Sequence, residues 1–157
     1  MSSPGRSYTK TAWSGAGSGC SAYESQPSWQ SLTGLDGNIT SVCSNRALAD
    51  VSAVADPNTG VAVYDTYGLS GWTVFGGASV STQIISAIYG LVGGLGTYNN
   101  GGAASDLYYA YTKSPGDFFS ITSGSNGSCG TDLDLCNAGS GWNGPTGLGT
   151  PDGAGAF

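Results

Sequence analysis

The central part of the chain alternates between short apolar runs and turn-forming residues. Residues 51–55 and 61–64 are mostly apolar, and the sequence Asp-Pro-Asn-Thr-Gly at 56–60 separates them. Pro, Asn, Asp and Gly favour tight turns, because each lowers the cost of a turn backbone conformation. Residues 71–75 form a third short run, which ends at two consecutive glycines. The pattern predicts three strands, at 51–55, 61–64 and 71–75.

After these strands the spacing of apolar residues changes to that of a helix. The positions are Ile84, Ile85, Ile88, Leu91 and Val92. Residues three and four apart share one face of a helix, so we expect a helix from near Ser79 to Gly93-Gly94. A second helix is predicted over 105–113. Residues 1–45 are polar and glycine-rich, and 114–157 are loop-rich. These elements indicate a single α/β domain over 1–157, with short strands and one long buried helix.

Composition and charge exclude two classes of function. Charged residues make up 9% of the chain, the net charge is −6, and only four residues are basic, at scattered positions. Nucleic-acid binding normally needs a basic patch, so we expect no nucleic-acid partner. No apolar run is long enough to cross a bilayer, so we also expect no membrane partner.

Four cysteines allow three pairings. The pairing between neighbours in the sequence is Cys20–Cys43 and Cys129–Cys136. Zinc is the alternative, but the chain has no Cys-x-x-Cys and no histidine. We therefore predict two disulfides, which indicate a secreted protein.

The junction between the third strand and the first helix carries the candidate chemistry. Gly76-Gly77-Ala78-Ser79 places a serine at the helix start, after glycines that permit a sharp turn. Amides at a helix start carry partial positive charge and can hold an oxyanion. Two interpretations are open from the residues alone. Ser79 either caps the helix or is the nucleophile of a hydrolase.

This junction, with the helix that follows it, resembles the Gly-Thr-Ser nucleophile motif of the sedolisins, the serine-carboxyl peptidases of family S53. Further blocks are similar and follow in family order from about residue 13, at 13–15, 19–21, 27–30, 50–57, 59–60, 123–127 and 145–151. The resemblance is to the C-terminal portion of the peptidase domain. It implies a partial subtilisin-like fold, with a mostly parallel sheet around a buried helix.

The resemblance also implies a catalytic deficit. In sedolisins a glutamate acts as the base for the serine, an aspartate orients that glutamate, and a second aspartate stabilises the oxyanion. All three precede the matched region, and the single glutamate here, Glu24, has no acid four residues later. Ala78 replaces the motif's threonine, and Gln83 replaces its proline. We expect a sedolisin homologue that keeps the nucleophile-position Ser79 and is proteolytically inactive alone.

Two alternatives remain open. In the first, the chain is part of an active acid serine endopeptidase that a separate N-terminal segment completes. In the second, a newly recruited acid such as Asp65 activates Ser79. Asp50 and Asp56 match structural positions, a strand edge and an Asp-Pro turn. An exposed sheet edge would favour association, either with that segment or as a homodimer, and any ligand would be a peptide or protein.

Sedolisins bind calcium through two aspartates and several backbone carbonyls. Here Ser120 and Asn143 stand at the two aspartate positions, while Ile121, Gly139 and Gly141 retain carbonyls. Calcium affinity falls as carboxylates are removed, so we expect no cofactor and a degenerate calcium loop. Asp132 and Asp134 are an alternative pair of acids.

Overall fold

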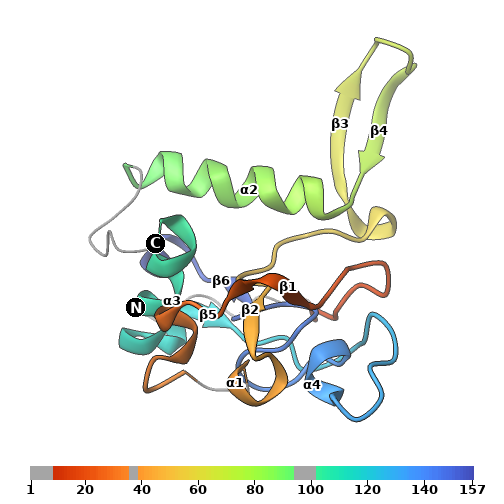
Figure 1. The fold of residues 1–157 in the computed structure, drawn as a ribbon. Coiled ribbons are helices and arrows are strands. Elements are labelled where there is room, and N and C mark those ends of the chain that lie inside the picture. The colour runs from red at the N-terminus through yellow and green to blue at the C-terminus, as the bar shows by residue number, and fades with distance from the viewer. Residues whose placement is uncertain (1–8, 36–38, 94–101) are drawn as a thin grey trace.

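A computed structural model describes residues 9–35, 39–93 and 102–157. Its strands are β1 Cys20–Ser25, β2 Asn45–Ala47, β3 Val61–Asp65, β4 Gly71–Phe75, β5 Phe118–Phe119 and β6 Thr150–Pro151. Its α-helices are α1 Ile39–Val42, α2 Ala78–Leu91, α3 Ala103–Lys113 and α4 Leu133–Cys136. Short 3-10 turns lie at Ser28–Ser31, Pro57–Thr59, Pro115–Asp117 and Ala154–Ala156. The α/β composition is as predicted, and Figure 1 shows the arrangement.

All strand pairing in the described residues is antiparallel. The strands form three two-stranded sheets, β1–β2, β3–β4 and β5–β6. The mostly parallel sheet that we expected is not found in these ranges. The prediction of a strand at 51–55 was wrong, because the backbone here hydrogen-bonds to a loop. Leu148 N–H donates to the Asp50 carbonyl (2.9 Å), and Ser52 N–H donates to the Gly149 carbonyl (2.9 Å).

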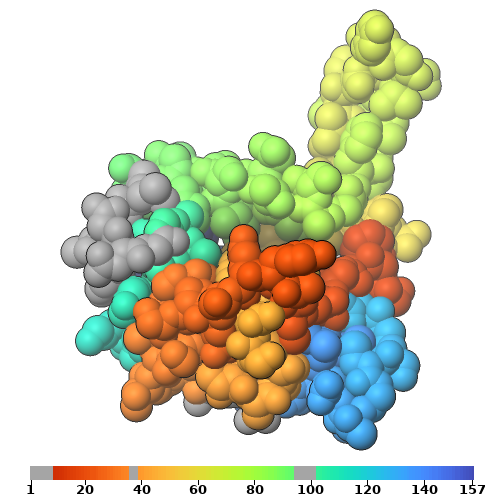
Figure 2. Space-filling view, in the orientation of Figure 1, coloured from red at the N-terminus to blue at the C-terminus, as the bar shows by residue number. Residues whose placement is uncertain are grey.

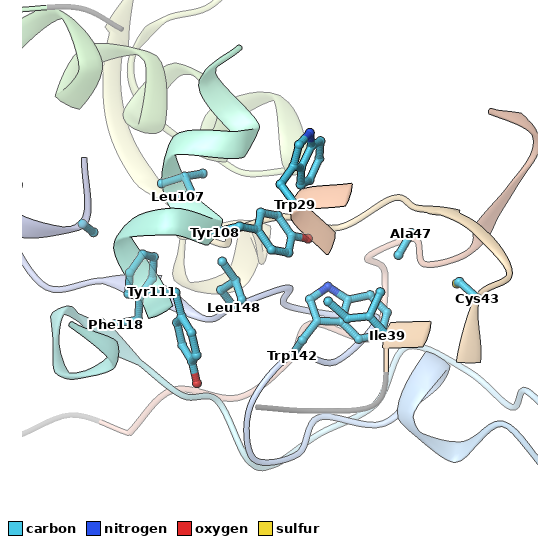
Figure 3. Close-up of a cluster of buried hydrophobic side chains, with 11 residues drawn as sticks. Trp29, Ile39, Cys43, Ala47, Leu107, Tyr108, Tyr111, Phe118, Trp142 and Leu148 are labelled. Atoms are coloured by element: carbon cyan, nitrogen blue, oxygen red, sulfur yellow. The ribbon is translucent and has the colours of Figure 1, made fainter. Parts of the chain in front are cut away.

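The hydrophobic core lies below α2, between α3, the 3-10 turn at Ser28–Ser31 and the C-terminal loops (Figure 3). Its buried members are Trp29, Ile39, Cys43, Ala47, Leu107, Tyr108, Tyr111, Phe118, Trp142, Leu148 and Ala156. The aromatic rings interlock, with centroids 4.8 Å apart for Trp29–Tyr108 and 5.3 Å apart for Tyr111–Phe118. Offset or tilted ring pairs of this kind stabilise a core beyond their buried area.

Helix α2 has the predicted position but not the predicted burial. It lies across the core body in Figure 1, and none of its residues is buried. The apolar positions Ile84, Ile85 and Ile88 are only half-buried. The expected buried helix is therefore wrong for the described structure, because the core covers only one side of α2. The helix ends at Leu91, and Gly93 adopts a positive φ of 97° soon after, as its glycine predicts; Gly94 lies outside the described residues.

The β3–β4 hairpin projects away from the core body, as Figures 1 and 2 show. Its register pairs Val61 with Phe75 at the base and Asp65 with Gly71 at the tip. Tyr64 and Trp72 face each other across the strands, with ring centroids 5.4 Å apart. Both predicted strands of the hairpin are confirmed. Their apolar runs predicted them, and the short loop between the runs favours antiparallel pairing.

Both predicted disulfides are confirmed. Cys20 bonds to Cys43, and Cys129 bonds to Cys136. The first joins β1 to the end of α1, and the second closes the loop that leads into α4. No helix in the described residues has the length and hydropathy to cross a membrane.

Candidate functional site

Two glycines fix the turn that leads into α2. A Cβ on Gly76 would lie 2.5 Å from Pro57 Cα and N and 2.6 Å from the Ala55 carbonyl oxygen. Gly77 has a positive φ of 96°, which L side chains rarely adopt. Because β4 ends against the backbone of 55–57, only glycine allows the chain to turn there and begin the helix.

Ser79 lies in the first turn of α2 and is exposed. The N-cap is Gly77, not Ser79, so the capping interpretation of the serine is wrong. Ala78 is the first helical residue, and Ser79 follows it. In the part of the chain that the structure describes, the Ser79 hydroxyl has no hydrogen-bond partner. Its side chain therefore lies at the positive end of a 14-residue helix, open to solvent.

A second serine of α2 holds this turn in place. The Ser81 hydroxyl donates to the carbonyls of Val54 (2.9 Å) and Ala53 (3.3 Å). Gly77 N–H also donates to the Ala55 carbonyl. The start of α2 is thus tied to residues 53–55 by both side-chain and backbone bonds. Sequence reasoning missed Ser81, because nothing in the local pattern distinguishes it from a solvated helical serine.

The acids considered as partners for Ser79 make other contacts or lie on other elements. Glu24 is exposed on β1. The Asp56 carboxylate accepts hydrogen bonds from Asn58 N and Nδ2, both 2.9 Å, and so caps the 3-10 turn. Asp65 is at the tip of the hairpin, where it accepts a hydrogen bond from Tyr67 N–H (2.8 Å). The hairpin tip, where Asp65 lies, is four residues of strand away from the hairpin base at Phe75. A strand rises about 3.3 Å per residue. In the described residues, no hydrogen bond joins any of these acids to Ser79.

The residues of the expected calcium loop do come together. The Asn143 Nδ2 group donates to the carbonyls of Gly139 (3.0 Å), Ile121 (3.4 Å) and Gly141 (3.4 Å). The exposed Ser120 hydroxyl is 3.4 Å from the same Gly139 carbonyl. Calcium needs six to eight oxygen ligands, several of them charged. In this cluster an amide N–H₂ group faces the carbonyls and no carboxylate is present, so these residues do not fit the ion.

The Asp132–Asp134 pair has a structural position. Asp132 precedes α4 as its N-cap, and Asp134 belongs to the helix. Among the described residues, no three Cys, Asp or Glu side chains are grouped so that they could hold a metal ion.

Comparison with known proteins places this geometry in a family. No protein-family model matches the chain. Sedolisin from Pseudomonas sp. (strain 101) is 32% identical over 136 residues, which are 87% of this chain and 21% of that protein. The solved structure of Pseudomonas sedolisin, a serine-carboxyl proteinase complexed with two molecules of pseudo-iodotyrostatin, matches with a TM-score of 0.67 and 31% identity. That match covers 92% of this chain and 39% of the solved chain.

The chain is a sedolisin-like domain. The relation expected from the sequence motifs is therefore confirmed by both sequence and fold. The domain spans about a fifth of the length of the sedolisin protein and about two fifths of the solved sedolisin chain.

The sedolisin-like domain also contains a buried polar network that sequence reasoning did not find. The Asp50 carboxylate accepts from Arg46 Nη2 (2.7 Å) and from the Tyr108 hydroxyl (3.1 Å). Gln30 Nε2 donates to the same hydroxyl (3.1 Å) and to the Ala47 carbonyl (2.9 Å). Ala47 N–H donates in turn to Gln30 Oε1 (2.9 Å). Only Asp50 was considered beforehand, and its structural role is consistent with these bonds.

Burial is the main cause of the raised pKa of Asp50 in this network and of nearby Tyr89. Desolvation raises the pKa of Asp50, and the bonds from Arg46 and Tyr108 oppose that rise only in part. Desolvation also raises the pKa of Tyr89 to about 12, with the charges of Asp106 and Asp50 acting in the same direction. The Tyr89 hydroxyl donates to the Ala103 carbonyl and so links α2 to the start of α3. Tyr89 thus joins α2 to α3, the Asp50 network lies outside α2, and no hydrogen bond within the described ranges connects either to Ser79.

Proposed function

We propose that this sedolisin-like domain retains the nucleophile position of a serine-carboxyl peptidase and does not cleave peptides by itself. The observation that carries the proposal is the exposed Ser79 hydroxyl in the first turn of α2, where Gly76 and Gly77 set its position. The backbone amides of that turn provide a field that favours an oxyanion. The chain thus offers the site of attack.

The chemistry of the serine explains why the domain alone is expected to be inactive. A serine hydroxyl is a weak nucleophile until a neighbouring base removes its proton. The sequence contains no histidine, and its one glutamate is the exposed Glu24 on β1. Asp56 and Asp65 each hold a nearby backbone amide, at 2.9 and 2.8 Å. In the part of the chain that the structure describes, none of these three acids therefore has an interaction that would let it act as the base for Ser79.

A covalent inhibitor tests this proposal directly. The 157-residue chain is treated with a fluorophosphonate at pH values from 3 to 8, and mass spectrometry identifies any modified serine. We expect no labelling at Ser79 beyond the level seen in a Ser79→Ala variant. The matched control is Ser86→Ala, which removes another exposed serine of the same helix. Stoichiometric labelling at Ser79 in wild type and Ser86→Ala, but not in Ser79→Ala, would disprove the inactive state.

A second function is favoured by apolar side chains exposed on the two elements that flank Ser79, the β3–β4 hairpin and α2. Large apolar side chains are exposed on the hairpin and at the end of α2, including Trp72 at 74% and Leu91 at 85%. Contiguous exposed apolar surface commonly marks an interface. The solved sedolisin chain extends well beyond the 39% that this domain matches. We propose that an N-terminal sedolisin segment covers α2 and the hairpin and supplies the missing acids, giving an acid endopeptidase in which a parallel sheet encloses the helix.

Mixing experiments separate this function from the first. The domain is combined with a recombinant sedolisin segment that carries the Glu and Asp pair, and light scattering and peptide cleavage at pH 3–5 are measured. A 1:1 complex with cleavage that Ser79→Ala abolishes supports completion by that segment. A homodimer without cleavage would support a binding module instead. A stable monomer under all conditions would contradict association of either kind.

We also propose that the domain is secreted. The support is the pair of disulfides, which persist in oxidising compartments. Fractionation of the producing cells, with alkylation before reduction, tests the location and the redox state together. Reduced protein inside the cell would contradict the proposal.

A further inference from the structure

The side chain of Asn143 is buried at the meeting point of two loops, with 1% of its surface exposed. Its Oδ1 atom accepts hydrogen bonds from Thr146 N–H (3.1 Å) and from the Thr146 hydroxyl (2.8 Å). A backbone N–H can only donate, so this contact fixes which end of the amide is oxygen. The Nδ2 group must therefore face the opposite side.

On that opposite side three backbone carbonyls converge on the nitrogen. They belong to Ile121 from one loop and to Gly139 and Gly141 from the other, at 3.0–3.4 Å. Carbonyl oxygens carry partial negative charge, so three of them around one point repel each other unless a positive group lies between them. Here the two N–H hydrogens of the amide provide that group, shared among three acceptors.

We infer that the Asn143 amide is a built-in substitute for a bound cation. Its nitrogen takes the central place among the carbonyls, and its oxygen binds the backbone behind it, so the two loops close without metal. A calcium ion with oxygen ligands at about 2.3–2.6 Å could not share this space with the amide nitrogen. The inference concerns the loop of 120–143 and does not depend on the proposed role of Ser79.

Aspartate has nearly the same shape as asparagine, but it places a negative oxygen where Asn143 has its positive N–H₂ group. Asn143→Asp keeps the size and the acceptor for Thr146, but it replaces the N–H₂ group with a second oxygen. A buried carboxylate would then face three carbonyl oxygens with nothing positive between them. Because such an arrangement is unfavourable without a cation, the variant should acquire a dependence on calcium. Ser120→Asp adds a second acid near the Gly139 carbonyl, at the exposed side of the cluster.

The experiment measures thermal melting and calcium binding for five forms of the full chain. Wild type and the single variant Ser120→Asp should melt at the same temperature in EDTA and in calcium, because Asn143 fills the centre in both. Asn143→Asp should melt lower in EDTA and gain about 5–10 °C at calcium concentrations about 100-fold above Kd. Ser120→Asp/Asn143→Asp should bind calcium more tightly than Asn143→Asp by calorimetry. The matched control is Asn45→Asp, in which an amide that donates to a single carbonyl, that of Ser21 (2.9 Å), is lost.

Several outcomes would overturn the inference. Calcium binding by wild type or by Ser120→Asp would show that the amide does not exclude the ion. An Asn143→Asp protein that calcium does not stabilise, whether it is folded or unfolded in EDTA, would show that the carbonyls do not form a cation cage. A calcium response of Asn45→Asp equal to that of Asn143→Asp would show a general effect of added charge.

Discussion

Removing the hydroxyl of Tyr108 is the most direct test of the polar network under α2. Tyr108 is completely buried, and its hydroxyl lies between Gln30 Nε2 and Asp50 Oδ1, 3.1 Å from each. Tyr108→Phe keeps the ring that packs on Trp29 and deletes only the oxygen. The change therefore isolates the hydrogen bonds from the packing.

The magnitude follows from the partners that remain. Gln30 is 1% exposed, and its other N–H and its oxygen are both engaged with Ala47, so the freed N–H has no alternative partner in the network. A buried donor left without an acceptor costs about 1–3 kcal/mol. Asp50 loses a donor but keeps Arg46 and some contact with solvent, which adds about 1 kcal/mol. We expect Tyr108→Phe to lower the free energy of unfolding by about 2–4 kcal/mol and Tm by about 4–16 °C.

Urea unfolding at pH 7, followed by tryptophan fluorescence, measures the change. Tyr64→Phe on the exposed hairpin is the matched control and should change the free energy by less than about 0.5 kcal/mol. In a double-mutant cycle with Gln30→Leu, the two substitutions should couple by about 1 kcal/mol or more. A Tyr108→Phe protein as stable as wild type, or two costs that simply add, would refute the role of the hydroxyl.

Two further substitutions test the pH dependence of the network and the turn before Ser79. The pKa of Asp50 is raised in the folded state, so its contribution to stability is complete below its ordinary value of 3.8 and is lost as pH rises through the folded pKa. Asp50→Asn should remove the loss of stability with rising pH that Asp50 causes. Urea midpoints of wild type and variant from pH 3 to 7 measure it, and the same pH dependence in both proteins would contradict the prediction. Gly76→Ala should destabilise by about 2 kcal/mol or more, because its Cβ would lie 2.5 Å from the Pro57 backbone. Gly90→Ala, on the open face of α2, should instead stabilise by about 0.5–1 kcal/mol in the same melts, and a change of the same sign in both variants would argue against the close contact.

Local features of this protein were predictable because short-range chemistry determines them. Turn residues between apolar runs predicted the β3–β4 hairpin, and apolar spacing predicted α2 and α3. The disulfides join cysteines that are near in sequence, so neighbour pairing identified them. The two glycines before Ala78 predicted the turn that positions Ser79, because few other residues tolerate that backbone.

Contacts between distant segments were not predictable in this way. The apolar run 51–55 has the composition of a strand, yet the backbone at Asp50 and Ser52 hydrogen-bonds to Leu148 and Gly149 of a distant loop. The Gln30–Tyr108 contact joins residues 78 apart, and no local pattern marks either as a partner of the other.

The sequence by itself determined the β3–β4 hairpin, the helices α2 and α3, the disulfides, the sedolisin motifs and the identity of the residues in the loop of 120–143. Only the tertiary structure decided that no residue of α2 is fully buried, that Asp65 lies at the hairpin tip, and that Asn143 turns its N–H₂ group toward three carbonyls. The physical reason is that propensity and spacing act over a few residues. Burial and the orientation of an amide depend instead on which surfaces the folded chain brings together. Ser79 illustrates both sides, since its motif is local and the partners that a nucleophile needs are not.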